Sequence, residues 1–571
     1  MIELFYKLPM KVKGIFFPAI IVLIIFLVGA LFIFLNTFLE NRVKSTLQGY
    51  INTSPDRPYD YSYKDISIQL LRGNTYLTEV KISPRPTTMG NLVGQKARFT
   101  IDAQIDTLAL RGLSVFQLLA NGSIDIDKIL VDNVHFRYFF NRDYTSPDSV
   151  EKRAFVLQDV FSENLKTVKI GEIQLRDISA YMNDINDKDT IFLSFDSANM
   201  VWKDLYTDDV IIRNLQPFTY SSLQMSAKNF IGNMIKSHTI RVRSFSLNTA
   251  MEEINFTGVH FGPVTFDLKD TSKQILRSIN EIDLEELLVS GINFDSWQED
   301  KRLEIHKITA KNPDVKVSMD HHWPKPMHER PYLSARVRRV PFRINIDTIY
   351  ASGGKMYYRE LFNDGNPPLE LFFTDASMTY LNVCNDTIIL ADTPDMTIDV
   401  NAMFLGTGKL STTIVYPVLD SLSTLYMKLK IDSMPLTVFN PILEGQVMAN
   451  VSGDINTIAM NFTANKYESK GDFVFDYSHL KVELFKEKQT KDGLKIKKNW
   501  IMNTLVNPLI RSNNNLSQEN FNKGVIDYQR PLDISFFGMV WQSLKGGMVT
   551  TLIPSRNPDN KNKNKDKKEK E

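Results

Sequence analysis

The chain has 571 residues, and its 67 lysine and arginine residues nearly balance its 66 aspartate and glutamate residues, which leaves a net charge of +1. This balance excludes the basic stripe of a nucleic-acid-binding protein, so we expect no nucleic-acid partner. The one cysteine, Cys384, excludes a disulfide framework within the chain and a cysteine metal cluster. We interpret Cys384 as a buried or half-buried strand residue and not as a nucleophile.

The first predicted element is an uncleaved membrane anchor. Residues 14–35, GIFFPAIIVLIIFLVGALFIFL, carry no charge and as a helix are long enough to cross the roughly 30 Å hydrocarbon layer. The alternative, a cleaved signal peptide, would have a shorter apolar region and a small-residue cleavage site, which the following NTFLENRVK lacks. Lysines precede the segment, so we expect residues 1–13 to stay in the cytoplasm. In a bacterium the bulk of this single-pass inner-membrane protein would then lie in the periplasm.

The remaining chain shows a repeated strand pattern. After residue 48, short runs such as YSYKDISIQLL alternate apolar and polar residues, which is typical of half-buried strands. One longer pattern recurs: apolar-x-apolar-x-x-apolar-x-apolar, a short polar or glycine pair, then apolar-x-apolar. Its copies begin at residues 124, 168, 282, 303 and 344. The chain is therefore predicted to be built from repeats.

We interpret each copy as a hairpin that contains a β-bulge. The extra residue in its first half would turn the second half to the opposite face unless a bulge absorbed it and kept four apolar side chains together. The acidic pair Glu285-Glu286 lies at one such bulge and is expected to face solvent. The polar pairs that follow suit a tight reversal. These pairs are Asp132-Asn133, Arg176-Asp177, Ser290-Gly291, Lys311-Asn312 and Ser352-Gly353.

Several helices are also expected. Short helical patterns precede three of the copies (SVFQLLANG, DVFSENLKT and TSKQILRSIN), and in the first of them Ser114 and Gln117 form a capping box. Further helices are predicted at 497–511 and 535–553, the second one apolar and interrupted at Gly546-Gly547, and residues 555–571 form a charged, disordered tail. We expect the short helices to lie across the sheet or to cap its ends.

The predicted fold class is mainly β: an N-terminal transmembrane helix followed by an elongated, curved, repeat-built antiparallel β-sheet groove with short capping helices. At about 15–20 residues per strand, the chain after the anchor would form on the order of 25–35 strands. Such a number favours an extended array over a compact sandwich. The pattern leaves open whether the apolar face is filled by side chains or open to a ligand.

Two regions carry a resemblance to a known family. Ser45–Phe139 contains LALRGLSVFQLLANGSIDIDKILVDNVHF, and Met434–Phe485 contains LEGQVMANVSGDINTIAMNFTANKYESKGDFVFDYSHLKVEL. In their order after an anchor they resemble the AsmA-like family, related to TamB and to the bridge-like lipid-transfer superfamily, in a Bacteroidota-type form. The resemblance implies an N-terminal AsmA-like β region at 45–150, a groove of repeated hairpins at 151–366 and a C-terminal AsmA-like β region at 367–486. It also implies roles in outer-membrane lipid supply or envelope assembly.

The leading functional hypothesis is a membrane-anchored groove that binds or transfers phospholipid for outer-membrane biogenesis. An acyl chain in water exposes methylenes worth about 0.8 kcal/mol each, and an apolar trough offsets that cost. The alternative is a structural scaffold for envelope or outer-membrane proteins, in which the apolar face is packed on itself. The predicted groove lining is Ile126, Ile129, Val131, Ile170, Ile173, Leu175, Leu284, Leu287, Ile305, Ile308, Ile346 and Ile349.

The C-terminal helix at 535–553 allows two interpretations. It can cap the last strands, or it can dock the far end of the groove on a membrane through Phe536, Phe537 and Trp541, since aromatic residues favour the headgroup layer.

No enzyme motif stands out, and we predict no enzyme activity and no cofactor. The histidines His321, His322 and His328 are interpreted as part of a solvated loop and not as a metal site. The sequence GTGKLS lacks the spacing of a phosphate-binding loop.

The membrane topology gives the first testable prediction. A reporter that is active only in the cytoplasm should work when it is fused before Lys7 and fail when it is fused after Leu480, because the lysines favour a cytoplasmic N-terminus. The reverse pattern would contradict both the orientation and the periplasmic location.

Overall fold

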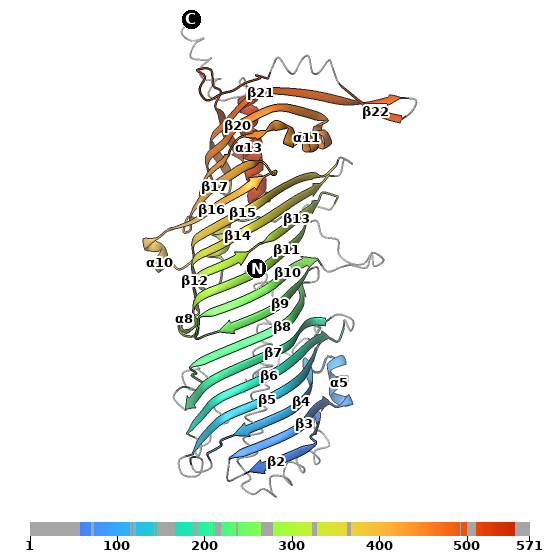
Figure 1. The fold of residues 1–571 in the computed structure, drawn as a ribbon, viewed down its shortest axis with the longest axis vertical. Coiled ribbons are helices and arrows are strands. Elements are labelled where there is room, and N and C mark those ends of the chain that lie inside the picture. The colour runs from blue at the N-terminus through green and yellow to red at the C-terminus, as the bar shows by residue number, and fades with distance from the viewer. Residues whose placement is uncertain are drawn as a thin grey trace. The chain divides into compact units, whose positions relative to one another are not determined.

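The structure is a computed structural model, and it is mainly β (Figure 1). None of the described helices is long and apolar enough to cross a membrane, and the predicted anchor at 14–35 lies outside the described residues. The residues that the structure describes are 58–69, 73–114, 117, 122–141, 143–144, 166–186, 191–208, 211, 218–235, 238–263, 278–322, 328–362, 367–490, 493–498 and 510–553.

The chain divides into two compact units, Met1–Ala250 and Met251–Glu571, and this boundary falls inside the region predicted as repeated hairpins. In unit 1, strands β1 and β2 both pair with β3, and the later strands then follow in chain order. The elements of unit 1 are β1 Tyr59–Ser62, β2 Asp65–Gln69, β3 Asn74–Pro84, α5 Pro86–Val93, β4 Phe99–Arg111, β5 Ser123–Phe140, β6 Thr167–Asp184, β7 Ile191–Asp208, β8 Ser222–Ile235 and β9 His238–Asn248.

Unit 2 also grows strand by strand along the chain, and short helices join some of its strands. Its elements up to β15 are β10 Glu253–Pro263, β11 Ser278–Asn293, α8 Phe294–Asp300, β12 Arg302–Lys311, β13 Asp314–Asp320, α9 Leu333–Arg338, β14 Arg343–Leu361 and β15 Leu369–Cys384. The later elements are α10 Thr387–Asp392, β16 Asp395–Phe404, β17 Gly408–Pro417, β18 Leu425–Ile431, β19 Met434–Pro435, η3 Leu436–Phe439, α11 Asn440–Val447, β20 Ala449–Ala464, β21 Glu468–Thr490, β22 Gly493–Lys498, β23 Gly524–Gln529 and α13 Phe536–Leu552.

The strand pairing is mixed, so the prediction of a purely antiparallel sheet is wrong. Strand β5 pairs in parallel with β6, and both β12 and β13 pair in parallel with β14. Parallel neighbours need a crossover of a dozen residues or more, and the chain supplies one in residues 141–166 and another in 321–342. The other strand pairs described within the two units are antiparallel.

The predicted hairpins are also wrong, because four of the five repeat copies continue through their polar pair as a single strand. The copies at 124, 168, 282 and 344 are the single strands β5, β6, β11 and β14. In every pair the second residue has a left-handed backbone that kinks the strand without reversing it, as a bulge does. The φ angles are 50° at Asn133, 48° at Asp177, 65° at Gly291, 48° at Asn312 and 66° at Gly353.

The copy at 303 is divided into two strands, yet its two halves also continue in one direction without a reversal. It breaks at Asn312-Pro313, where proline has no N–H to give to a ladder. Both halves still pair with β14 in one continuing register, with Lys311 opposite Ser352 and Asp314 opposite Lys355. Because the halves of each copy merge into one line, the described residues form 23 strands, fewer than predicted.

The spacing between two successive repeat copies matches the register of the parallel strand pairs. Ile124 lies opposite Val168 and Leu303 lies opposite Ile344, so corresponding residues of two copies are neighbours in space. Alignment of like positions places apolar beside apolar along the whole strand. This arrangement explains why the same pattern returns in the sequence.

The predicted helices have different outcomes. The three short patterns lie largely outside the described residues, although the Ser114 Oγ accepts the predicted bond from the Gln117 N–H at 3.4 Å. The helix predicted at 497–511 is wrong at its start, since Lys497 and Lys498 belong to β22 and pair with β21. Most of its remaining residues lie outside the described part of the chain.

The predicted C-terminal helix is confirmed as α13, which Ser535 caps by accepting the Gly538 N–H at 3.1 Å. It packs on β21 and β23 through a stripe of mostly small, buried residues, namely Met539, Ser543, Gly547 and Thr551. The predicted break at Gly546-Gly547 is wrong, because a Cβ at Gly547 would lie 2.3 Å from the Phe473 ring and glycine is what allows the close approach. The interpretation of this helix as a cap therefore has a structural basis.

The two glycines of α13 give a matched test of this packing. We expect Gly547→Ala to destabilise the full chain by about 1–3 kcal/mol, since Phe473 is fully buried and cannot move aside. We expect Gly546→Ala to stabilise it by up to about 1 kcal/mol, since nothing lies within 4 Å of that Cβ position and alanine favours a helix. Thermal unfolding in detergent measures both. Equal effects of the two substitutions would contradict the packing described.

Candidate functional site

The strongest candidate site in unit 2 is an apolar row that crosses its strands. Residues directly opposite on paired strands share a face, so a chain of such pairs traces a line across the sheet. We call this line the long apolar row, and every member but the glycine is hydrophobic. It consists of Ile254, Val289, Ile308, Ile349, Tyr380, Ile398, Ile414, Met427, Phe462, Gly471 and Ile526.

A second row lies beside the first. It is also apolar apart from Thr412, so that face of unit 2 is at least two apolar residues wide along each strand. Its members are Phe256, Leu287, Ala310, Ala351, Met378, Val400, Thr412, Leu429, Met460 and Phe473.

Unit 1 has a row of the same kind, which we call the unit 1 row. It crosses seven strands without a polar residue, and each step is a direct cross-strand pair. It consists of Leu77, Leu108, Val131, Leu175, Met200, Met225 and Leu247.

The predicted lining residues belong to these faces. In unit 1, Val131 and Leu175 are in the row, while Ile126 pairs with Ile170 and Ile129 with Ile173 in the same core cluster. In unit 2, Ile308 and Ile349 are in the long apolar row and Leu287 is in the second. Ile305 pairs with Ile346, and Leu284 pairs with Val259. The bulge interpretation, with four apolar residues of a copy on one face, agrees with this clustering.

Burial differs along the face. The predicted lining residues of unit 1 are buried, and Val131 and Ile126 have no exposed surface. In unit 2, Ile308, Ile349 and Tyr380 are half-buried, whereas Ile398, Ile414 and Met427 farther along the long apolar row are buried. Within the long apolar row, the members on β12, β14 and β15 are thus more accessible than those on β16, β17 and β18. The other predicted lining residues of unit 2, namely Leu284, Leu287, Ile305 and Ile346, are buried.

Aromatic residues and α13 account for part of this burial. In unit 1 the Trp202 ring, opposite Ile173, contacts the rings of Phe218 and Tyr220 at 4.6 and 5.6 Å between centroids. In unit 2, α13 covers Phe473, and its Ser543 Oγ lies 2.7 Å from the Ser469 Oγ of β21. The C-terminal end of the apolar face is therefore closed by the chain's own helix.

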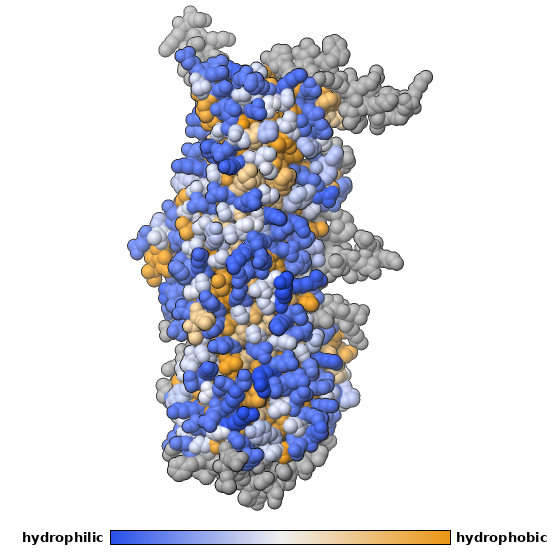
Figure 2. Space-filling view, viewed as in Figure 1, coloured by the Kyte–Doolittle hydropathy of each residue, from blue (hydrophilic) through white to orange (hydrophobic). Residues whose placement is uncertain are grey.

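The other face of the strands is polar. The side of the molecule drawn in Figure 2 carries mostly hydrophilic residues, with hydrophobic ones in small groups. In unit 2 a shallow depression of about 370 Å³ is lined by polar residues such as Asn401, Ser411 and Lys428. Val400, Leu429 and Met460 of the second row line it as well. The depression therefore adjoins the second row, whereas no member of the long apolar row lines it.

The acidic pair at a bulge behaves broadly as predicted. Glu285 is exposed, whereas Glu286 is half-buried and accepts bonds from Lys311 and from the Asn255 Nδ2. The hydrogen bond from Lys311 lowers the pKa of Glu286, so this carboxyl is ionised at neutral pH and is a structural partner, not a proton donor.

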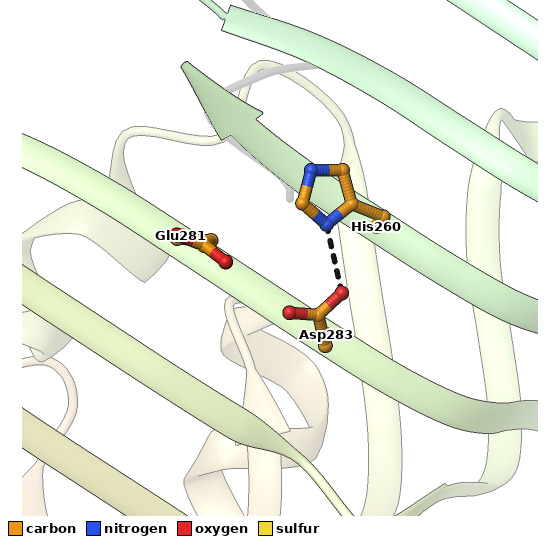
Figure 3. Close-up of side chains that lie close together, drawn as sticks. All are labelled: His260, Glu281 and Asp283. Carbon is orange, nitrogen blue, oxygen red and sulfur yellow. Dashed lines mark hydrogen bonds and ion pairs between the residues drawn. The ribbon is translucent and has the colours of Figure 1, made fainter.

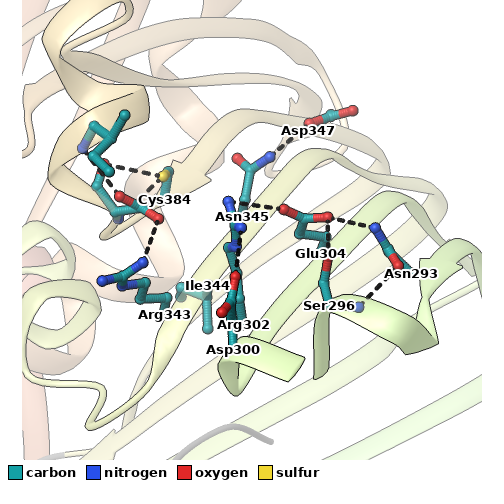
Figure 4. Close-up of polar contacts among 12 residues, drawn as sticks. Asn293, Ser296, Asp300, Arg302, Glu304, Arg343, Ile344, Asn345, Asp347 and Cys384 are labelled. Carbon is teal, nitrogen blue, oxygen red and sulfur yellow. Dashed lines mark hydrogen bonds and ion pairs between the residues drawn. The ribbon is translucent and has the colours of Figure 1, made fainter. Parts of the chain in front are cut away.

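A polar network fixes the ends of β11, β12 and β14 (Figure 4). The Glu304 carboxylate accepts hydrogen bonds from Asn293 Nδ2 at 2.8 Å and Ser296 Oγ at 2.7 Å and lies 3.2 Å from Arg302. The Asn293 side chain also accepts the Ser296 N–H and caps α8. Each of these polar groups holds a strand end or a helix cap, so the network explains local rigidity and offers no nucleophile.

Cys384 lies near this network and is fully buried. Its sulfur accepts the Asp386 N–H at 3.3 Å, and burial raises the pKa of the thiol. Because the thiolate is the reactive form, this cysteine is a poor nucleophile. The prediction of a buried strand residue is confirmed.

The predicted histidine loop does not bring its rings onto one centre. His321 contacts Glu360 and stacks on Phe362, while His322 bonds Asp320 at 2.7 Å. Within the described ranges, the group of three potential metal ligands lies elsewhere, at His260, Glu281 and Asp283. The sequence alone did not indicate this group, because His260 is distant in the chain from Glu281 and Asp283. It meets them only through the pairing of β10 with β11.

The face of α13 that looks away from β21 is exposed and aromatic. Phe537 is 66% exposed and Trp541 is 44% exposed, and Lys545 continues the same line one turn later. Phe536 points differently, since its ring packs against Tyr332 at 6.1 Å between centroids. Two of the three predicted docking residues are thus available on the surface.

Comparison with known proteins adds no assignment. No protein-family model matches the chain, and no curated protein sequence matches it. The functional argument therefore stands on the geometry of the apolar rows.

Proposed function

We propose that this protein is a membrane-anchored lipid-binding protein of the AsmA-like type, which holds phospholipid on an apolar groove in the periplasm and carries it from the inner membrane for outer-membrane biogenesis. The observation that supports this proposal best is the long apolar row, which crosses unit 2 from β10 to β23 and whose members other than the glycine are all hydrophobic. A folded protein needs an apolar face, but it does not need an unbroken line of this length in one direction.

The dimensions suit an acyl chain. Neighbouring strands are about 4.8 Å apart, so the ten steps of the row measure about 48 Å along the sheet. One acyl chain fills about half of the roughly 30 Å hydrocarbon layer. The row is therefore about three acyl chains long. An acyl chain lying anywhere along it would be kept from water, which stabilises the bound lipid by about 0.8 kcal/mol for each buried methylene.

Accessibility supports the same function in one part of unit 2. Ile308, Ile349 and Tyr380 are half-buried, so their apolar atoms are reachable on β12, β14 and β15. A lipid headgroup needs no specific site in this scheme, since it can remain in water at the margin of the groove.

The exposed face of α13 fits a membrane contact at the C-terminal end of unit 2. Phe537, Trp541 and Lys545 combine aromatic rings with a cation, the residue types that favour the headgroup layer. We include in the proposal that this face meets a second membrane or a membrane partner, while the small-residue stripe keeps the helix on β21.

A second function is favoured by the burial in unit 1. Val131, Ile126 and Leu175 have almost no exposed surface, which suits a face packed on the protein itself. Such a protein would act as a structural scaffold that holds envelope or outer-membrane proteins, for example by strand addition. The two functions differ in whether lipid accompanies the protein.

The proposal is tested by measuring the phospholipid content of the protein after substitutions on its apolar face. We expect Ile308→Asp combined with Tyr380→Asp to lower the phospholipid that co-purifies with the full chain at least about tenfold, since charge on the apolar row repels an acyl chain. Mass spectrometry of the detergent-extracted protein measures this content.

The matched control is Thr309→Asp combined with Leu381→Asp. These residues stand next to the first pair on the same two strands but on the opposite face, and Leu381 is exposed. The control should retain its lipid, and unfolding curves should show that both variants fold. Undiminished lipid in the folded first variant would contradict the groove and leave the scaffold.

A further inference from the structure

Three side chains from two neighbouring strands meet on the polar face of unit 2 (Figure 3). His260 lies on β10 directly opposite Asp283 of β11, and Glu281 stands two residues before Asp283 on the same face. The intervening Ile282 pairs with Phe261, so the alternation of the two strands presents the three polar side chains together. Their positions are set by backbone pairing and not by a loop.

The three groups have the distances of a cation site. One ligand atom from each residue lies within 4.8 Å of the other two, and the His260 Nδ1 is 2.7 Å from the Asp283 Oδ1. In a tetrahedral zinc site with bonds of about 2.0–2.2 Å, ligand atoms lie about 3.3 Å apart. Small side-chain rotations are enough to reach that geometry.

Gly262 leaves the space that the cluster needs. Continuing the register by one residue beyond Phe261 and Ile282 sets Gly262 opposite Glu281. A Cβ at Gly262 would lie 2.8 Å from the His260 Nε2 and 3.5 Å from the Glu281 Cγ. Glycine therefore lets the imidazole lean across β10 toward Glu281, and any side chain would fill this space.

The local charge also suits a cation. On the next strand Asp314 lies opposite Asp283, and Lys316 lies opposite Glu281 with its Nζ 3.0 Å from the Glu281 Oε1. Because Lys316 forms an ion pair with Glu281, it competes with a metal ion for this ligand. The three carboxylates outnumber the one lysine.

We propose that His260, Glu281 and Asp283 bind a divalent transition-metal ion, with Zn²⁺ as the ion that fits best. One imidazole with two carboxylates is a ligand set of zinc, and three protein ligands leave a fourth position open to water. The ion would link β10 to β11, whose connection spans residues 264–277, and would thereby stabilise this part of the sheet. The site is independent of the lipid function, because it lies on the opposite face from the apolar rows.

Zinc binding to the full chain tests the proposal. The protein is purified in detergent without a histidine tag, and equilibrium dialysis against Zn²⁺ gives the stoichiometry and the affinity. We expect one zinc per chain for the wild type, and His260→Ala and Asp283→Asn should each weaken binding by about tenfold or more. Zinc should raise the unfolding temperature of the wild type and not that of His260→Ala.

A matched control separates this site from ordinary histidine–carboxylate pairs. The His306 Nδ1 lies 3.0 Å from the Asp347 Oδ2 across two strands, but these residues belong to no described group of three ligands. His306→Ala should leave zinc binding unchanged. Lys316→Met should tighten it several-fold, since it releases Glu281, whereas Gly262→Ala should weaken it.

The outcomes are decisive even if one variant folds poorly. Wild-type protein without stoichiometric zinc would overturn the proposal, and so would equal affinity in the wild type and in folded His260→Ala. Tighter binding in Lys316→Met together with loss in Asp283→Asn would support it, since a site elsewhere on the chain would respond to neither.

Discussion

The structure depends on one constraint, which is that the bulges of neighbouring strands stay aligned. A shift of one residue turns every later side chain to the opposite face of a sheet. Asn133 of β5 and Asp177 of β6 are both left-handed and stand at matching positions of their strands. Because the irregularity is shared, Val131 pairs with Leu175 on one side of it and Val134 pairs with Ile178 on the other. The apolar face thus passes through the kink without interruption.

The same constraint accounts for the division of chemistry between the two faces. Aligned strands produce unbroken apolar rows on one face and lines of polar residues on the other. The first arrangement suits a ligand without fixed polar groups, and an acyl chain is such a ligand. The second brings His260, Asp283 and Glu281 together, although none of them contributes to the apolar face.

Much of this could be predicted from the sequence, but the pairing could not. Alternation identified the strands, and the repeated pattern identified which residues share a face, as Ile126, Ile129 and Val131 do. The polar pairs were interpreted as reversals because Asn, Asp and Gly adopt the left-handed backbone in turns and in bulges alike. A tight turn makes neighbours antiparallel, whereas the bulge leaves one long strand whose partner is the next copy, so the direction of pairing was predicted wrongly.

Other features needed the register of the sheet. Met427 and Phe462 looked like ordinary strand residues, and only cross-strand pairing shows that they continue a line that begins at Ile254. The buried side of α13 was equally unpredictable from the sequence. A glycine pair in a helical pattern indicates a break, and only the structure shows that Gly547 packs against the Phe473 ring.

The central claim is that lipid contacts the long apolar row, and the most direct measurement is site-specific photocrosslinking in cells at two adjacent positions. A photoreactive residue in place of Ile308 faces the row, and the same residue in place of Thr309 faces the polar side of β12. The account predicts a phospholipid adduct at Ile308 and none at Thr309. Adducts of protein alone at Ile308, or equal lipid adducts at both positions, would contradict it.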